Sequence, residues 1–160
     1  MEKQILKILE RDARTTPDKI AVMIGATEQE VADAISQMEV KGVIRHYKAI
    51  VDWEKVGKET VFAFIDVRVS PSRGVGFDDV ASRIYRYPEV HSVYLVSGDY
   101  DLRVVVEGKT MRDVAFFVAE KLSTLEGVLS TRSSFLLKKY KVDGDVFDEQ
   151  AADARLAVTP

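Results

Sequence analysis

The residues with the clearest capacity for chemistry lie in one short segment, Gly98-Asp99-Tyr100-Asp101. Its two carboxylates could hold a cationic group, and the backbone N–H groups of a glycine turn could hold an anionic one. The same residues also suit a tight hairpin, because glycine and aspartate tolerate the positive φ angles that such turns need. The segment is therefore both a candidate binding site and an ordinary turn.

The rest of the sequence offers little support for enzymatic or metal chemistry. There is no cysteine, and the two histidines, His46 and His91, are too far apart in sequence to suggest a paired ligand set. No Ser/His/Asp set, glycine-rich phosphate loop or acid pair at a credible catalytic spacing occurs. A lone histidine is more often packed or solvated than catalytic, and Trp53 is more typical of a core or linker anchor than of a stacking platform. We expect no enzyme, no metal site and no cofactor.

Composition and charge limit the class of protein. The chain has 160 residues, of which 46% are hydrophobic, and this suffices for two small domains with cores. It has no run of about eighteen apolar residues, and its start, Met-Glu-Lys-Gln, lacks the pattern of a signal peptide, so we expect a cytoplasmic protein with no membrane partner. The net charge of -3 argues against non-specific coating of nucleic acid, so any DNA contact must come from a local patch.

The first third of the chain has the pattern of three helices. Apolar residues repeat at three- and four-residue spacings from Glu2 to Arg14, which predicts the first helix. Thr16 and Pro17 suit the start of a short second helix. Thr27-Glu28-Gln29-Glu30 has the form of a capping box and starts a third helix, which ends at Gly42.

A tight turn at Gly25-Ala26 separates the last two helices, and this arrangement is typical of a helix-turn-helix, whose final helix enters the major groove of DNA. The segment from Gly42 to Asp52 predicts an extended strand that leads out of the motif. We expect residues 1–52 to form a winged helix-turn-helix head, followed by a linker over residues 53–59.

Residues 60–142 predict a second domain with the element order βαββαβ. The expected strands are Thr60–Val69, Val90–Ser97, Leu102–Glu107 and Val128–Tyr140, and the expected helices run from Phe77 to Tyr85 and from Thr110 to Leu122, with Pro71 to Gly76 as a loop. This order is that of the ferredoxin-like fold, an antiparallel sheet with both helices on one face, so the fold class is α+β. We expect a second copy to cover the apolar open face of the sheet, and residues 143–160 to form a polar, partly disordered tail.

Both domains resemble the Lrp/AsnC, or feast/famine, family of leucine- and asparagine-responsive transcription regulators. In the head the resemblance rests on Ile5-Leu6, Arg11-Asp12-Ala13-Arg14, Ile20-Ala21, Gly25 and Gly42-Val43-Ile44. In the second domain it rests on the element order and on Gly98-Asp99-Tyr100-Asp101-Leu102, which is similar to the family's amino-acid-regulation (RAM) domain. The resemblance covers nearly the whole chain to about residue 141.

The resemblance implies that a free amino acid binds at this turn, where dimers of the family meet. The α-amino group of this ligand needs an anion, which Asp101 or Asp99 could supply. The ligand's carboxylate needs N–H donors, which the Gly98 turn could supply. Carried over residue by residue, the effector site consists of Gly98, Tyr100, Asp101, Thr131 and Ser133. Ligand binding would then shift the assembly among dimer, tetramer and octamer.

The predicted recognition helix departs from the family, whose members usually carry several basic residues there. From Thr27 to Val40 it has four acidic residues and no lysine or arginine. Carboxylates are repelled by phosphates, although they can accept from cytosine N4, and glutamine can pair with adenine. We expect Gln29, Asp33, Ser36 and Gln37 to read double-stranded DNA if the head binds it. Arg45 and Lys48 would hold phosphates, or would belong to a solvated surface.

Three functions stay open at this point. The favoured one is a small-molecule-responsive, DNA-binding transcription regulator. The second is an oligomeric ligand-sensing module whose acidic head has lost DNA binding and serves protein contacts. The third is an enzyme similar to sirohaem decarboxylases, which we disfavour because those enzymes have an arginine- and proline-rich segment in place of Gly98–Asp101.

Overall fold

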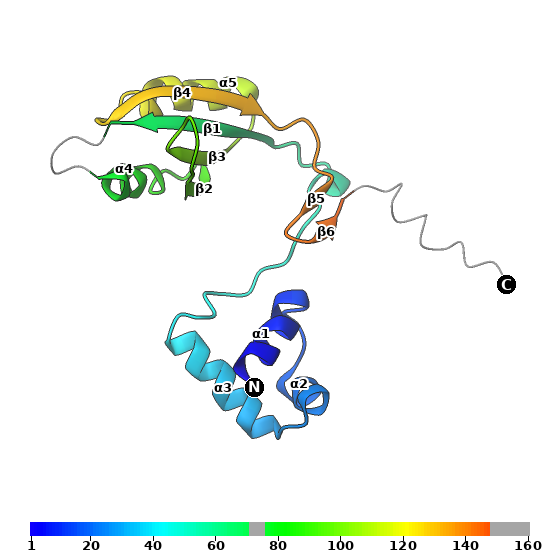
Figure 1. Ribbon diagram of the computed structural model, residues 1–160. Coiled ribbons are helices and arrows are strands. Elements are labelled where there is room, and N and C mark those ends of the chain that lie inside the picture. Colours follow the sequence, from blue (N-terminus) through cyan, green and yellow to red (C-terminus); the bar gives the residue numbers. More distant parts are fainter. Residues whose placement is uncertain (71–75, 148–160) are drawn as a thin grey trace. The chain divides into compact units, whose positions relative to one another are not determined.

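The computed structural model describes residues 1–70 and 76–147, and the chain divides into two compact units, Met1–Val51 and Asp52–Pro160 (Figure 1). Most of the predicted loop from Pro71 to Gly76 and most of the predicted tail lie outside the described residues. Within the described ranges, no helix is long and apolar enough to cross a membrane.

The first unit is a bundle of the three predicted helices, α1 (Glu2–Arg11), α2 (Pro17–Ile24) and α3 (Glu28–Val40). Each helix buries one apolar stripe, and the shared core consists of Ile5, Leu9, Ile20, Ala21, Val31, Ala34 and Met38. The first helix ends three residues before the predicted Arg14. Asp12 leaves the helical conformation and its carboxylate accepts from the N–H of Arg14, which turns the chain.

Local capping signals account for the helix boundaries. The Thr27 hydroxyl accepts from the Glu30 N–H, and the Glu30 carboxylate accepts from the Thr27 N–H, so the predicted capping box is confirmed. Gly25 ends α2 and Gly42 follows α3, both with left-handed backbones (φ 70° and 69°) that glycine adopts without strain. Thr16 is the N-cap of α2 as predicted, but its side chain makes no cap hydrogen bond.

The predicted strand from Gly42 to Asp52 is wrong for the single chain. The N–H groups of Val43 and Ile44 both donate to the carbonyl of Met38, which makes a turn, and the residues after it have no regular structure. A strand requires a neighbouring strand to complete its ladder, and no described segment of this chain pairs with residues 42–52. The predicted linker contains one short 3₁₀ turn, Glu54–Val56.

The second unit confirms the predicted ferredoxin-like fold. Its strands are β1 (Val61–Val69), β2 (Val90–Leu95), β3 (Leu102–Gly108) and β4 (Val128–Phe135), joined in one antiparallel sheet of order β2-β3-β1-β4. Helix α4 (Phe77–Ile84) connects β1 to β2, and α5 (Met111–Phe116) continues as a π-helical segment, η2 (Phe117–Leu122), before β4. A second capping box, made by Thr110 and Asp113, starts α5.

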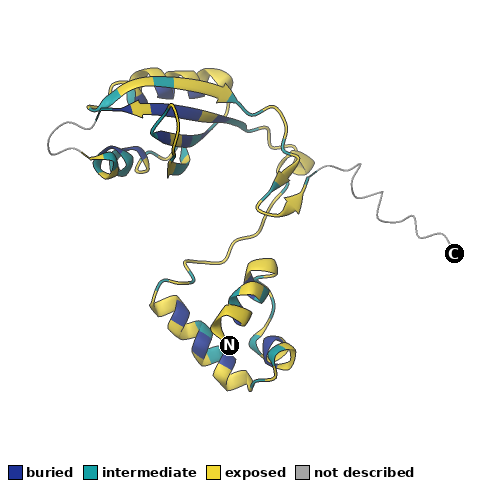
Figure 2. Cartoon of the chain, in the orientation of Figure 1, coloured by how far each residue is buried: buried dark blue, intermediate teal, exposed yellow. Residues whose placement is uncertain are grey.

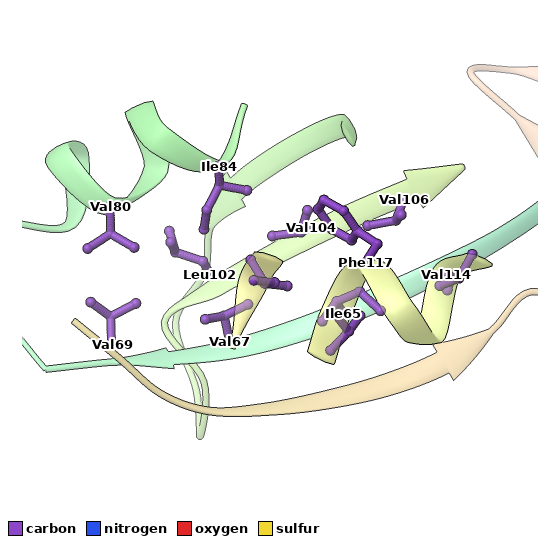
Figure 3. Close-up of a cluster of buried hydrophobic side chains, with 13 residues drawn as sticks. Ile65, Val67, Val69, Val80, Ile84, Leu102, Val104, Val106, Val114 and Phe117 are labelled. Atoms are coloured by element: carbon purple, nitrogen blue, oxygen red, sulfur yellow. The ribbon is translucent and has the colours of Figure 1, made fainter. Parts of the chain in front are cut away.

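One face of the sheet carries the core of this unit. Residues of β1 and β3 that alternate along the strands pack against Val80 and Ile84 of α4 and against Val114 and Phe117 of α5 and η2 (Figure 3). Figure 2 shows that buried residues concentrate on these two central strands. The other face of β1 presents Phe64, Asp66 and Arg68, and no described helix covers it.

The C-terminal end of this unit differs from the prediction. The last strand ends at Phe135, not at Tyr140, and β5 (Lys141–Val142) and β6 (Asp145–Val146) then form a small hairpin. Asp143 and Gly144 make its turn, both with positive φ (49° and 97°). An Asp-Gly pair between short strands is a strong hairpin signal, and it would have predicted this element in place of the start of a tail.

Candidate functional site

The turn from Gly98 to Asp101 is pinned to the end of β1 by Asp101. The Asp101 N–H donates to the carbonyl of Val67 at 3.0 Å, and its Oδ2 accepts from the N–H of Val69 at 2.8 Å. Gly98 has a φ of 142°, which a side chain would strain, although a Cβ there would meet no atom within 4 Å. The backbone conformation, and not crowding, therefore requires glycine at this position.

Arginine side chains hold the rest of the turn. The Arg68 guanidinium donates to the carbonyl oxygen of Asp99 through Nε (3.1 Å) and Nη2 (2.6 Å). The Tyr100 ring centre lies 5.5 Å from the guanidinium carbon of Arg68 and 4.9 Å from that of Arg132. Since Arg68 and Arg132 lie on the face of the sheet away from the helices, the Tyr100 ring covers one end of that face.

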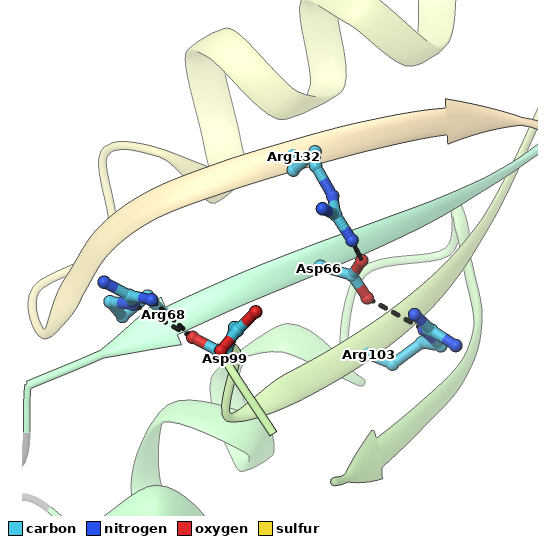
Figure 4. Close-up of polar contacts among 5 residues, drawn as sticks. All are labelled: Asp66, Arg68, Asp99, Arg103 and Arg132. Atoms are coloured by element: carbon cyan, nitrogen blue, oxygen red, sulfur yellow. Dashed lines mark hydrogen bonds and ion pairs between the residues drawn. The ribbon is translucent and has the colours of Figure 1, made fainter. Parts of the chain in front are cut away.

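A charged cluster that the sequence analysis missed lies next to this turn, and we call it the Asp66 cluster: Asp66, Arg68, Arg103 and Arg132 (Figure 4). The Asp66 side chain is only 5% exposed. Its Oδ1 accepts from Arg103 Nε at 2.8 Å, and its Oδ2 accepts from Arg132 Nη2 at 2.9 Å.

The hydrogen bond from Arg103, followed by that from Arg132, holds the pKa of Asp66 below its ordinary value against the opposing effect of burial. Two guanidinium groups contact this one carboxylate, and the third arginine, Arg68, contacts the Asp99 carbonyl, so the cluster has a net positive charge. Strand register brings these residues together: Asp66 pairs with Arg103 on β3 and with Arg132 on β4. Alternation along β1 could have placed Asp66 and Arg68 on one face, but only the register identifies their neighbours.

The structure separates the predicted effector residues into two groups. Gly98, Tyr100 and Asp101 lie together in the turn. Thr131 and Ser133 pair with Val67 and Ile65 of β1, which face the helices, so their side chains lie on the opposite face of the sheet from the Tyr100 ring. The Thr131 hydroxyl lies 3.4 Å from that of Ser123, at the end of η2.

The outward face of α3 carries all four predicted DNA readers. Gln29, Asp33, Ser36 and Gln37 are exposed, and Gln29 Nε2 donates to Asp33 Oδ1 at 2.9 Å. The Glu30 carboxylate is engaged in the capping box, and the hydrogen bond from the Thr27 N–H lowers its pKa. Arg45 and Lys48 are exposed on the segment that leaves the head.

The residues considered for metal or aromatic chemistry have other surroundings. Among the described residues, no group of three or more histidine, cysteine, aspartate or glutamate side chains could hold a metal ion. The His91 ring packs edge-on against Phe62, with ring centres 5.9 Å apart. Trp53 is 50% exposed in the linker, where the Lys58 ammonium lies 4.8 Å from its ring centre, so it is not a core residue.

Comparison with protein families gives two matches that follow the two units. Residues 1–45 match the family described as winged helix-turn-helix DNA-binding, and residues 62–146 match the Lrp/AsnC ligand binding domain. The second match includes the β5–β6 hairpin.

Two curated relatives are similar to this chain over most of its length. An uncharacterized HTH-type transcriptional regulator of Bacillus subtilis, YugG, is 53% identical over 160 residues, which is 99% of this chain and 96% of YugG. The HTH-type transcriptional regulator FL11 of Pyrococcus furiosus is 30% identical over 141 residues, which is 88% of this chain and 90% of FL11.

Solved structures of transcription regulators have the same fold. A regulator from Neisseria meningitidis, solved as a complex with L-Met, is 26% identical and superposes with a TM-score of 0.72 over 88% of this chain and 90% of that chain. The leucine response regulatory protein of Mycobacterium tuberculosis, 24% identical, has a TM-score of 0.75 over 92% and 97% of the two chains and supports the fold alone.

Proposed function

Since the chain belongs to the Lrp/AsnC family of ligand-responsive, DNA-binding transcription regulators, we propose that its effector is a free amino acid and that the Gly98–Asp101 turn binds it. The observation that carries this proposal is that hydrogen bonds fix the turn against β1. Because Asp101 and Arg68 tie the turn to β1, its backbone N–H groups and its carboxylate are held in place before a ligand arrives. The complex of the Neisseria meningitidis relative with L-Met supports the same ligand class.

The two charges of an amino acid fit this turn. Asp101 Oδ2 is held by the Val69 N–H, so we assign Oδ1 to the ammonium group of the ligand. The backbone N–H groups near Gly98 supply donors for its carboxylate. Thr131 and Ser133, on the other side of the sheet, join the same site if it forms between copies of the chain, as the resemblance implies.

We propose a dimer as the basic unit, with tetramers or octamers built from it. The face of the sheet opposite the helices presents Phe64 and Tyr94 together with the Asp66 cluster, and a second copy would cover these apolar rings. Binding of an amino acid where dimers meet would change the assembly and hence the spacing of the heads on DNA.

In the head, we assign base reading to Gln29, Asp33, Ser36 and Gln37, and phosphate contacts to Arg45 and Lys48. All six side chains are exposed, as this role requires. The acidic character of α3 favours the second candidate, in which the head serves protein contacts and the protein senses its ligand without reading DNA. Binding of specific DNA separates the two candidates.

The effector assignment is tested by thermal unfolding of the full chain with each of the twenty amino acids, in the wild type and in Asp101→Asn. The asparagine keeps an oxygen for the Val69 N–H but loses the charge. We expect at least one amino acid to raise the Tm of the wild type and to have little effect on the variant, because a ligand that binds only the folded state stabilises it. An equal rise in both proteins would place the site elsewhere, and no rise with any amino acid would contradict an amino-acid effector.

A further inference from the structure

One side-chain contact ties the segment that leaves the head to the recognition helix. The Tyr47 hydroxyl donates to Glu39 Oε1 at 2.9 Å, across eight residues of sequence. Partial burial, followed by this hydrogen bond, raises the pKa of Tyr47 above its ordinary value. We call this contact the Tyr47–Glu39 clamp.

The clamp acts where the backbone supplies no fixed structure. The turn after α3 is anchored by two hydrogen bonds to the carbonyl of Met38, and Ile44 packs against the core of the head. Beyond Ile44 the segment belongs to no strand or helix. After that anchor, Tyr47 makes a side-chain hydrogen bond back to α3, so the clamp limits the positions that residues 45–48 can adopt.

Glu39 would otherwise be unfavourable at its position. It lies in the last turn of α3, where the helix dipole disfavours a negative charge, and that turn contains no basic residue. It also follows Ser36 by three residues, at the edge of the face that we assign to DNA, where a free carboxylate would repel phosphates. Accepting the Tyr47 hydrogen bond gives this carboxylate a donor and a defined position.

The two cations of the segment lie on either side of the clamp. Arg45 precedes Tyr47 by two residues and Lys48 follows it directly, and both side chains are exposed. We propose that Tyr47 and Glu39 are positioning residues for DNA binding, which hold Arg45 and Lys48 where they can contact phosphates. This inference rests on the proposed DNA-binding function. It explains how an acidic residue of α3 would strengthen DNA binding and not weaken it.

The clamp is tested by salt titration of DNA binding with two matched pairs of variants in the full chain. Tyr47→Phe removes one hydroxyl without a change in charge, and Tyr85→Phe, at an exposed tyrosine at the end of α4, is its control. Glu39→Ala and Glu39→Gln both remove the negative charge, but only glutamine keeps an oxygen that can accept from Tyr47. Each variant is also made in the Arg45→Ala, Lys48→Ala background.

We expect Tyr47→Phe to lower the affinity about threefold or more, since the lost hydrogen bond has a charged acceptor. It should also make the plot of log K against log salt concentration less steep, because each phosphate contact contributes about 0.9 to the slope. Tyr85→Phe should bind as the wild type does, and Glu39→Gln should bind more tightly than Glu39→Ala. In the Arg45→Ala, Lys48→Ala background, Tyr47→Phe should have a clearly smaller effect, because the two cations that the clamp positions are absent.

Two results overturn the clamp while the proposed function stands. One is a Tyr47→Phe protein with the affinity and salt dependence of the wild type. The other is an equal loss from Tyr47→Phe with and without Arg45 and Lys48, which would indicate a general effect on the head. Absence of DNA binding by the wild-type protein, with or without amino acids, would refute the proposed DNA-binding function and the clamp with it.

Discussion

Replacing Asp66 with asparagine should destabilise the second unit, because this carboxylate joins three neighbouring strands, β3, β1 and β4. Its side chain is 5% exposed and accepts one hydrogen bond from Arg103 and one from Arg132. Hydrogen bonds to charged groups contribute about 1.5–3 kcal/mol each when measured by deletion. Both arginines are about half exposed, with side-chain exposures of 48% and 60%, so they recover hydration when the carboxylate is lost and the cost is smaller.

We therefore expect Asp66→Asn to lower the free energy of unfolding by about 1–2 kcal/mol at pH 7. Urea unfolding followed by far-UV circular dichroism measures this difference. Asp99→Asn is the matched control, because Arg68 contacts the backbone oxygen of Asp99 and not its carboxylate. The control should unfold within about 0.5 kcal/mol of the wild type.

The pH dependence gives a second test of the same contact. The pKa of Asp66 is lower in the folded protein than in the unfolded chain, where it is about 3.9. Its stabilising contribution is therefore complete above the unfolded value and is lost as the pH falls through the folded value. The difference between wild type and Asp66→Asn should shrink as the pH falls below about 4. A variant as stable as the wild type at pH 7, or a difference as large at pH 2 as at pH 7, would refute this reasoning.

Two further substitutions test local structure in the two units. Thr27→Ala removes the hydroxyl of the capping box and should cost about 1 kcal/mol of head stability by urea unfolding. Thr16→Ala, at an N-cap whose side chain makes no cap hydrogen bond to the backbone, should cost clearly less, and equal losses would contradict the cap assignment. Gly98→Ala places a side chain on a backbone with a φ of 142° and should cost about 1–3 kcal/mol in the same assay, and a neutral effect would mean that the turn relaxes to another conformation.

The sequence was sufficient for elements whose signals are local. Helical periodicity, the capping box at Thr27 and the glycine at residue 42 set the boundaries of α3 because each acts within a few residues of itself. The βαββαβ order followed in the same way from periodicity and turn residues. The strand expected from Gly42 to Asp52 was wrong because a strand depends on a partner, and the described chain supplies none there.

The candidate site was predictable only in part. Gly98, Tyr100 and Asp101 were found through the turn residues, but the bond that pins Asp101 to Val69 joins residues 32 positions apart, and periodicity carries no information about it. The Asp66 cluster was missed for the same reason, since Arg103 and Arg132 reach Asp66 only through strand register. The placement of Thr131 and Ser133 on the helix side also required the register.

The central claim, that an acidic recognition helix still belongs to a DNA-binding, ligand-responsive regulator, is tested most directly by fluorescence anisotropy on DNA from the protein's own upstream region. The titration covers a range of salt concentrations, with and without amino acids, for the wild type and for Arg45→Ala, Lys48→Ala. We predict sequence-dependent binding that weakens steeply with salt and changes when an amino acid is added. In the variant, the slope of log K against log salt concentration should be smaller by about 0.9 for each phosphate contact removed. No binding to this DNA at low salt under any of these conditions would contradict the account and leave a sensing module that does not read DNA.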